Sequence, residues 1–172
     1  MQAKCPGTGQ DDRSEERVTF DQRELRNALG RFATGVTIVT TMTDDGPLGI
    51  TANSFASVSL DPALVLWSPA RKSARFPAFE AADYFAIHIL AADQRDLSER
   101  FARSGDAFHD LDFGRGLGDA PLLDGCAARF ECKHAAGHDG GDHLIVVGEV
   151  QRIQEADRAP LIYHRGAYAG LA

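Results

Sequence analysis

Residues 49–62 read GITANSFASVSLDP, and small hydroxyl and amide side chains dominate this stretch although strongly apolar runs flank it. The interior of a β-strand normally carries β-branched and aromatic residues. Small polar side chains pack poorly on a sheet, so their number indicates a ligand that is rich in acceptors and lies close to the backbone, such as a flavin with its phosphate tail. A polar strand-and-turn connection is the alternative interpretation.

The runs on either side of this stretch predict β-structure. Residues 36–41, VTIVTT, are β-branched at every position, which is typical of a strand. A turn at residues 44–47, DDGP, separates them from a second expected strand at 48–55, so the two are predicted to form a hairpin. Residues 62–67, PALVLW, follow as a short strand that we expect to be buried on both faces.

The rest of the chain predicts peripheral helices and further hairpins. Asp21 and Glu24 have the spacing of a capping box, and apolar residues follow at i, i+3, i+4 and i+7 up to Phe32, with Gly35 as the expected stop. The other expected elements are a short helix at 72–79, a strand at 84–90, a helix at 93–103, a hairpin of 126–133 with 143–153 across a long loop at 134–142, and an edge strand at 161–168. Hairpins outnumber the helical crossovers that parallel strands need, so the predicted fold class is mainly β, an antiparallel β-barrel with peripheral helices.

Length and composition indicate one globular domain. The chain has 172 residues, of which 44% are hydrophobic and 25% charged, enough to form a single core. We expect residues 1–17 to be a disordered N-terminal tail and residues 18–172 to form the domain. The net charge of −7 argues against a nucleic-acid partner, and no run approaches the roughly 18–20 apolar residues of a membrane span.

The cysteines and the N-terminus predict a cytoplasmic location. Three cysteines are present, Cys5, Cys126 and Cys132, and a low, odd count is typical of reduced thiols. Residues 1–10 lack the apolar region of a secretory signal.

Three other kinds of site do not fit the spacing of the sequence. Residues 114–118, GRGLG, have the wrong third interval for a dinucleotide-binding fingerprint, and no G-x-S-x-G elbow of a serine hydrolase is present. Cys126 and Cys132 are too far apart for a zinc knuckle, although His134 and His138 have the spacing of its second half. We expect no metal and interpret both cysteines as small core residues; a zinc-stabilised structural domain is the alternative.

Two positions suggest contacts to a cofactor. Residues 71–75, RKSAR, are the one local basic cluster in this acidic chain, and they follow Trp67, Ser68 and Pro69 at the end of a predicted strand. If Ser73 opens a helix, backbone N–H groups, a hydroxyl and two or three cations converge into a phosphate site; a solvated charge patch is the alternative. His143 opens a strand after a loop and is either a group that orients a cofactor or a surface residue at a strand end.

Five motifs in this order resemble one family. They are FATGVTIVTT at 32–41, the stretch at 49–62, SERFA at 98–102, GDHLIVVGEV at 141–150 and PLIYHRGAY at 160–168. Together they cover about residues 20–170 and resemble the flavin reductase family, the small reductase components of two-component, flavin-dependent monooxygenases. The strand that contains Trp67 is most similar to the nitrilotriacetate monooxygenase component B branch.

The resemblance implies an FMN-binding split barrel, a homodimer with flavin near the subunit interface, and reduction of FMN or FAD by NADH or NADPH. Hydride would pass from C4 of the nicotinamide to N5 of the flavin, and reduced flavin would go to a partner monooxygenase. Backbone N–H groups facing N5, O4 and O2 would stabilise the negative charge, and no side chain need transfer a proton in the hydride step. A non-catalytic FMN-binding electron-transfer or flavin-carrier protein on the same barrel is the alternative.

The resemblance also implies which residues form the site. Thr51, Ala52, Asn53, Ser54 and Ser57 would line the isoalloxazine and ribityl chain, and Ser68, Pro69, Lys72 and Ser73 would lie toward the phosphate. Phe101 and Ala102 would border the tail of the flavin, and His143 would orient the nicotinamide with Tyr168 close to the same pocket. Ala74 stands where family members often carry a second Ser or Thr, so one phosphate hydroxyl is missing.

Overall fold

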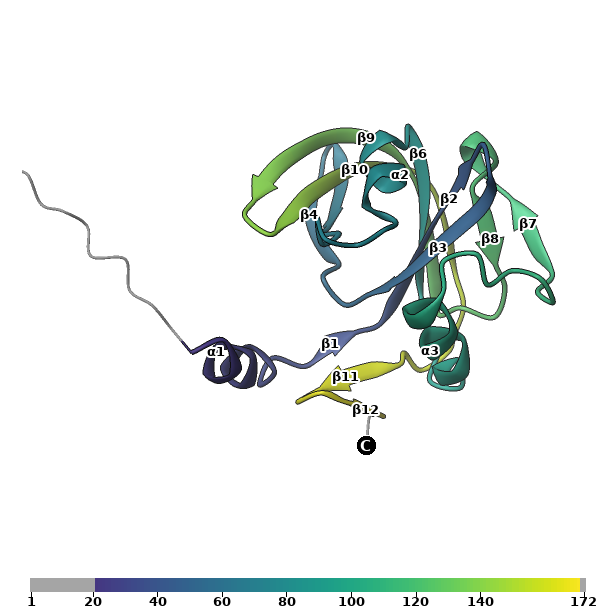
Figure 1. Cartoon of the computed structure of the whole chain (residues 1–172). Helices are drawn as coiled ribbons and strands as arrows, with labels where there is room; N and C mark the ends of the chain where they lie inside the picture. Colours follow the sequence, from purple (N-terminus) through teal and green to yellow (C-terminus); the bar gives the residue numbers. More distant parts are fainter. Residues whose placement is uncertain (1–20, 171–172) are drawn as a thin grey trace, which may run out of the picture.

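The computed structural model describes residues 21–170, and the predicted N-terminal tail lies outside them (Figure 1). The elements are α1 (Gln22–Leu29), β1 (Thr34–Gly35), β2 (Thr37–Thr43), β3 (Gly46–Ala52), β4 (Ala56–Leu60), β5 (Ala63–Trp67), α2 (Phe76–Ala81), β6 (Tyr84–Ile89), α3 (Arg95–Arg103), β7 (Phe113–Arg115), the short 3-10 helix η1 (Leu117–Asp119), β8 (Pro121–Leu123), β9 (Ala128–Gly140), β10 (His143–Glu155), β11 (Ile162–His164) and β12 (Ala167–Ala169).

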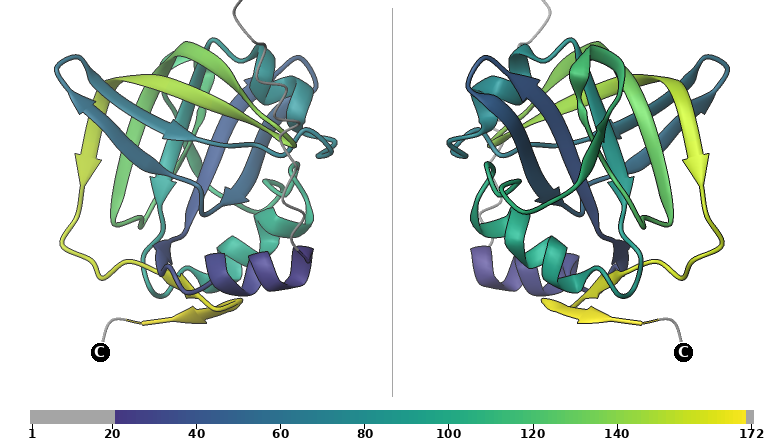
Figure 2. Two further views of the ribbon diagram at one scale, coloured as in Figure 1. Left: turned by 90° about the vertical axis from the view of Figure 1, so that its left-hand side faces the viewer. Right: turned by 90° about the vertical axis from the view of Figure 1, so that its right-hand side faces the viewer.

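All strand pairs are antiparallel, as predicted. The main sheet has seven strands in the order β3-β2-β6-β9-β10-β5-β4 and curls into a barrel (Figure 1). A second sheet, β1-β11-β12, lies with α1 and α3 at one end of the barrel, and α2 lies at the other end (Figure 2). We call α1, β1, β11 and β12 the terminal layer. The backbone of Leu161 joins this layer to the barrel, because its N–H donates to the Leu90 carbonyl and its carbonyl accepts from Val36.

The hairpin of β9 and β10 differs from its prediction. Both strands continue to the turn at Gly141–Asp142, and the long loop expected at 134–142 is wrong. Ala136 and Gly137 continue the ladder, Ala135 lies at a β-bulge, and Gly141 takes the left-handed conformation, with φ of +74°. The edge strand expected at 161–168 is likewise a hairpin, β11 and β12. The structure also contains β4, which the sequence patterns did not indicate.

Two helices begin or end elsewhere than predicted. The helix expected at 72–79 occupies Phe76–Ala81, where Pro77 lies in the first turn and interrupts no helical hydrogen bond. Asp21 caps α1 as expected, with its carboxylate accepting from the N–H of Arg23 at 2.6 Å. This helix ends at Gly30 instead of Gly35, and none of its residues is buried. Its apolar positions therefore do not pack on the barrel.

Two hydrophobic clusters form the core. The first surrounds Trp67 inside the barrel and includes Phe76 and Phe79 of α2. The second lies between α3 and the terminal layer around Phe101 and Phe108, whose ring centroids are 4.8 Å apart. Among the described residues, no helix is long and apolar enough to cross a membrane.

Candidate functional site

A cavity of about 230 Å³ forms where the end of β3 meets α3 and the terminal layer. Thr51, Ala52 and Asn53 line it, with Ala102 from α3 and Tyr168 from β12. The structure therefore brings together five of the predicted cofactor-binding residues. Two further lining residues, Val36 and Tyr163, were missed by the sequence reasoning, although both lie inside the quoted motifs at 32–41 and 160–168.

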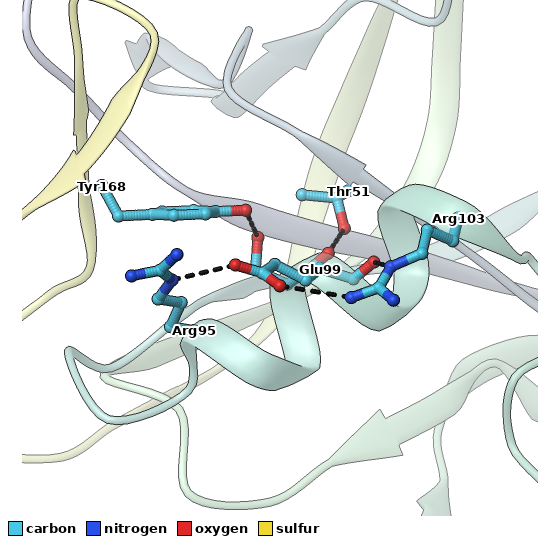
Figure 3. Close-up of polar contacts among 6 residues, drawn as sticks. Thr51, Arg95, Glu99, Arg103 and Tyr168 are labelled. Atoms are coloured by element: carbon cyan, nitrogen blue, oxygen red, sulfur yellow. Dashed lines mark hydrogen bonds and ion pairs between the residues drawn. The ribbon is translucent and has the colours of Figure 1, made fainter.

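Two of the residues that line this cavity, Thr51 and Tyr168, are hydrogen-bonded to helix α3 (Figure 3). The hydroxyl of Thr51 donates to the carbonyl of Ser98 at 2.7 Å, and the Ser98 hydroxyl lies 2.9 Å from the phenolic oxygen of Tyr168. Since Ser98 is fully buried, this pair of hydrogen bonds is shielded from solvent. The Thr51 hydroxyl is thus used as a donor within the protein, and only its acceptor capacity remains for a ligand.

Charged side chains of α3 lie on the outer side of this hydrogen-bond network. Glu99 accepts from Arg95 at 2.9 Å and from Arg103 at 3.2 Å, and the guanidinium of Arg95 lies 5.1 Å from the ring centroid of Tyr168 (Figure 3). These pairs are exposed, so each contributes little to stability, but the cation–π contact restricts the orientation of the Tyr168 ring.

Arg75 does not face a phosphate as the sequence pattern suggested. Its guanidinium donates to the carbonyls of Phe101 at 2.6 Å, Ala102 at 3.3 Å and Gly49 at 3.4 Å, and so binds the C-terminal end of α3 to β3. A cation at this end of a helix interacts favourably with the helix dipole. Burial lowers the pKa of the guanidinium, and the charge of Asp106 opposes this shift. Arg75 therefore positions Ala102.

The ring of Phe101 lies in the core and does not line the cavity. It is fully buried against Phe108 and Gly49, and a Cβ atom at position 49 would lie 2.7 Å from the ring. Gly49 is therefore required so that β3 can approach α3. The border that the family resemblance assigned to Phe101 is formed at this cavity by its neighbour Ala102.

Ser54 connects this cavity to the segment after β5. Its hydroxyl accepts from the N–H of Ser68 at 2.9 Å, and the carbonyl of the next residue, Pro69, accepts from Leu144 of β10. Ser57 is exposed on the edge strand β4 and lies outside the cavity lining. Ser54 and Ser68 thus form one polar link, whereas the structure does not bring Ser57 to it.

The predicted phosphate segment forms a turn, and the expected helix start at Ser73 is wrong. Arg71 pairs with Asp139 at 2.7 Å and also donates to the Gly141 carbonyl, so it is held against the β9–β10 turn. Lys72 is exposed, and the Ser73 hydroxyl accepts from the N–H of Arg75 at 3.3 Å. The convergence of two or three cations does not occur, and Lys72 is the cation of this segment that extends into solvent.

His143 lies beside this turn and not in the cavity of Tyr168. It forms an isolated β-bridge with Ala70, and its Nδ1–H donates to the carboxylate of Asp142 at 2.7 Å. This hydrogen bond and the charge of His143 lower the pKa of Asp142. With Nδ1 engaged, the Nε2 atom is the nitrogen available to a ligand. The candidate site therefore has two parts, the cavity and the His143 end, which Asn53, Ser54 and Ser68 connect.

A larger cavity of about 960 Å³ adjoins the first and shares Asn53 and Tyr163 with it. Its walls are mostly apolar, and it also contains Ser54 and Thr34. The Thr34 hydroxyl is buried and has no hydrogen-bond partner among the described residues. An unpaired buried hydroxyl beside an exposed amide is a setting that a polar, ring-containing ligand can satisfy. Ligand sites commonly occupy about 300–1,000 Å³, so the two cavities together have room for a cofactor.

The strand β9 does not gather its cysteine and histidines into a metal site. Cys132 is fully buried, and burial raises the pKa of its thiol to about 12. Cys126, just before the strand, is half-buried, and burial raises its pKa to about 11. Within residues 21–170, no three His, Cys, Asp or Glu side chains are arranged to hold a metal ion. The geometry does not support a zinc-stabilised domain.

The side chains that line the cavity limit the kinds of reaction that it can support. Its lining supplies apolar walls, two tyrosine rings, one hydroxyl, one amide and backbone, and no carboxylate, histidine, cysteine or lysine of residues 21–170 belongs to it. Nucleophilic or acid–base catalysis needs an activated group in hydrogen-bond reach of the substrate. A site of this composition can bind and orient aromatic ligands, so the reactive atoms must come from those ligands.

Comparison with known proteins identifies the family. The model of the "Flavin reductase like domain" matches residues 29–172. The chain belongs to this family. The flavin reductase-like chain is 57% identical over 148 residues to an FMN reductase (NADH), SmoA, of Agrobacterium fabrum, covering 86% of this chain and 85% of that protein. It is 53% identical over 148 residues to the reductase component of a trigonelline monooxygenase of Acinetobacter baylyi, covering 85% of this chain but only 48% of that protein.

Solved structures support the same family and the split-barrel fold. Nitrilotriacetate monooxygenase component B from Mycobacterium thermoresistibile is 41% identical, with a TM-score of 0.83 and coverage of 88% of this chain and 87% of that one. The NADH:FAD oxidoreductase SgcE6 of Streptomyces globisporus, in complex with NAD and FAD fragments, is 37% identical, with a TM-score of 0.84 and coverage of 88% and 93%. The sequence resemblance of the flavin reductase-like chain is therefore confirmed.

Proposed function

We propose that this protein is an NAD(P)H-dependent flavin reductase that delivers reduced FMN or FAD to a monooxygenase. The observation that carries the proposal is the cavity at the end of β3, which has walls for flat aromatic ligands and no catalytic acid, base or nucleophile of its own. Membership of the flavin reductase family and similarity to an FMN reductase (NADH) support it. When bound together, a reduced nicotinamide and a flavin supply the hydride transfer.

The residues of the chain contribute positioning. Ala52 and Asn53 offer backbone groups and one exposed amide to the flavin ring, and Thr51 is held in place by its hydrogen bond to Ser98. Tyr168 and Tyr163 pack edge to face with ring centroids 5.5 Å apart and close the cavity on the side of the terminal layer. Rigid walls of this kind reduce the entropic cost of bringing two rings together.

The second part of the site holds the phosphate and the nicotinamide. Lys72 and Ser73 lie toward the flavin phosphate in this proposal, with Ser68 and Pro69 as the backbone support of that segment. Asp142 fixes the ring of His143 through Nδ1, so that Nε2 can accept a hydrogen bond from the nicotinamide carboxamide. His143 therefore orients the hydride donor and does not transfer a proton in the hydride step.

Initial rates test the function directly. We expect the protein at catalytic concentration to oxidise NADH or NADPH with FMN, FAD or riboflavin as acceptor, and to bleach the flavin band near ~450 nm under anaerobic conditions. A non-catalytic flavin carrier would instead bind flavin without many turnovers. An Asn53→Ala variant should lower the rate, whereas Arg115→Gln, which alters an exposed ion pair on β7, serves as a matched surface control. Stoichiometric bleaching alone would contradict the proposal.

We further propose that the protein acts as a cytoplasmic homodimer. Large apolar side chains are exposed in two groups, Leu25, Leu29 and Phe32 around α1 and Val58, Leu60 and Ile153 near the tip of β4 and β5. A subunit contact over the second group would remove its side chains from water, while the first group adjoins the larger cavity. Two free cysteines and the use of a pyridine nucleotide support a reducing compartment. Sedimentation analysis of the wild type and of a Leu60→Glu variant tests the dimer, and a monomeric wild type would contradict it.

A further inference from the structure

Four arginines differ from all others in the described part of the chain. Arg23, Arg26, Arg31 and Arg165 form no ion pair or side-chain hydrogen bond within residues 21–170. The other arginines between positions 21 and 170 each have such a partner; they are Arg71, Arg75, Arg95, Arg100, Arg103, Arg115, Arg129, Arg152 and Arg158. All four unpartnered guanidinium groups belong to α1, its C-terminal end and the β11–β12 turn, in a protein whose net charge is −7.

Three of them, Arg26, Arg31 and Arg165, line one cavity of about 410 Å³, and we call these three the arginine cluster. The backbone holds it together, since the N–H of Arg165 donates to the carbonyl of Gly30 at 2.9 Å. A Cβ atom at position 30 would lie 3.5 Å from the Cα of Arg165, an ordinary contact distance, so the two backbone segments are direct neighbours. Figure 1 shows α1 and the β11–β12 hairpin together below the barrel.

The backbone at Arg165 supports a functional reason for an arginine there. The two-residue turn between β11 and β12 has φ of +53° at Arg165 and +81° at Gly166. Such turns favour glycine, asparagine or aspartate, because other side chains are strained in the left-handed region. An arginine kept in that conformation, whose guanidinium has no polar partner among residues 21–170, is a candidate for binding an anion.

The arginine cluster is continuous with the proposed flavin site. Arg26 and Arg165 also line the larger cavity of about 960 Å³, which in turn shares Asn53 and Tyr163 with the cavity at the end of β3. Among residues 21–170, no carboxylate lines the two cavities that contain the arginines. The larger cavity therefore offers a basic rim and an apolar wall that includes Leu29 and Phe32, whose side chain is 77% exposed.

We propose that the arginine cluster binds the diphosphate of an ADP moiety, with Phe32 and Leu29 against its adenine. Guanidinium groups bind phosphate oxygens in bidentate geometry, and an exposed aromatic ring offers a surface for stacking a base. The inference rests on the proposed reductase function, in which one end of a dinucleotide occupies the cavity of Asn53. An ADP half occurs both in the nicotinamide dinucleotide and in FAD, and the experiment separates these two sources.

The first arm compares full-length and truncated hydride donors with FMN as acceptor. In the double variant Arg26→Gln/Arg165→Gln, we expect the KM for NADH to rise about tenfold, while the KM for reduced nicotinamide mononucleotide changes less than twofold. Arg165→Lys should recover part of the loss. Arg23→Gln is the matched control, because Arg23 is on the same helix but lines neither cavity.

The second arm compares FAD with FMN, using reduced nicotinamide mononucleotide as donor. If the double variant raises the KM for FAD but not for FMN, the ADP half of FAD is the occupant: the arginine cluster keeps its assignment, and the placement of the flavin phosphate toward Lys72 and Ser73 is overturned. Three outcomes would each overturn the assignment of the arginine cluster. The double variant could change the KM equally for full-length and truncated ligands, or Arg23→Gln could have as large an effect as Arg26→Gln. The third is that a changed oligomeric state causes the rise in KM.

A binding measurement keeps the inference independent of turnover. Calorimetric titration of the full-length protein with ADP should give a dissociation constant that rises about tenfold in the double variant and that also rises with KCl concentration. Phe32→Ala should weaken ADP but not inorganic pyrophosphate. Wild-type protein that binds ADP but oxidises no donor would refute the reductase function alone, and wild-type protein that turns over without binding ADP at this cluster would refute this inference alone.

Discussion

The barrel and the terminal layer use similar side chains in opposite ways. In the barrel, Trp67 is 1% exposed and the buried hydroxyls of Thr37, Thr40 and Thr41 each donate to a backbone carbonyl. In the terminal layer and its link from α1, Phe32 is 77% exposed, and the Thr34 hydroxyl has no partner within residues 21–170. The barrel core therefore excludes water from its aromatic side chains, although the Nε1–H of Trp67 also lacks a partner within residues 21–170, whereas the terminal layer leaves large apolar side chains at the surface.

Removal of one aromatic side chain from each region gives the largest contrast. Trp67→Ala should lower the free energy of unfolding by about 3–5 kcal/mol, because it leaves a cavity between Phe79 and Phe85. Phe32→Ala should change it by less than about 0.5 kcal/mol, since the side chain is exposed. Urea denaturation of both variants measures the difference. Equal losses would show that the terminal layer is part of the same packed core.

The buried histidine of the barrel predicts a pH dependence. His88 donates from Nδ1 to the Ile38 carbonyl at 3.0 Å and accepts at Nε2 from Leu123 at 3.1 Å, and burial lowers its pKa to about 4. The unfolded chain, with an ordinary histidine pKa, takes up the proton first as the pH falls. Stability should therefore be complete above about pH 6.5 and fall by up to about 3 kcal/mol by about pH 4.

Unfolding free energies measured between pH 4 and 8 test this expectation. A His88→Leu variant should be less stable at pH 7 and should lose this component of the pH dependence. His109→Gln is the control, because His109 is exposed and should leave the profile unchanged. A wild-type stability that rose as the pH fell through this window would contradict the role of His88.

His143 tests the part of the site that the barrel supplies. We expect His143→Ala to raise the KM for NADH about tenfold and to lower kcat less, because the imidazole orients the donor. Asp142→Asn should have a smaller effect of the same kind, since the amide still accepts from Nδ1. Steady-state kinetics with FMN as acceptor separate the two parameters. A collapsed kcat with an unchanged KM would assign His143 a different role.

Variants of Tyr168 and Tyr163 test how the terminal layer is attached to the barrel. Tyr168→Phe removes the hydrogen bond to Ser98 and should lower the free energy of unfolding by about 1 kcal/mol. Tyr163→Phe is the matched control, since the structure gives its hydroxyl no hydrogen bond within residues 21–170 and the ring contact with Tyr168 remains. Thermal and urea unfolding compare the two variants. Equal losses of unfolding free energy would show that the hydrogen bond between Tyr168 and Ser98 contributes nothing specific to stability.

The smallest effect should come from the charged face of α3. Glu99→Gln disrupts the pairs with Arg95 and Arg103, which are exposed, so Tm should fall by no more than about 2 °C. The effect should shrink further as the salt concentration rises. A larger loss that salt does not change would mean that Glu99 has a packing role.

Local patterns predicted most of the barrel. The β-branched run at 36–41 and the turn at 44–47 are found in the β2–β3 hairpin, and the strand at 84–90 and the helix at 93–103 also form. The hydrophobic pattern of each of these elements is set by its own residues, so it can be recognised in the sequence. The strand β4 and the full length of β9 and β10 were missed, because small and polar residues such as Ala136 and Gly137 are held there by pairing across the sheet.

The candidate site was predictable where a motif lies on one strand and not where its partners come from other elements. Residues 51–53 and Tyr168 belong to quoted motifs and line the cavity together. Nothing in the pattern at 71–75 indicates that Arg75 donates to carbonyls at the end of α3, since those acceptors are backbone atoms about 26 positions away. Likewise, Phe101 belongs to a motif but serves as core, because β3 approaches it at Gly49.

The half-buried thiol of Cys126 and the buried thiol of Cys132 have a consequence for the chemistry around the protein. Reduced flavin released in air reacts with dioxygen and yields hydrogen peroxide, which oxidises thiolates to sulfenic acid and beyond. With pKa values of about 11 and about 12, these two groups are almost entirely protonated at neutral pH, with about one thiolate in ten thousand or fewer. The fold thus protects both sulfur atoms from the oxidant that its own proposed product generates.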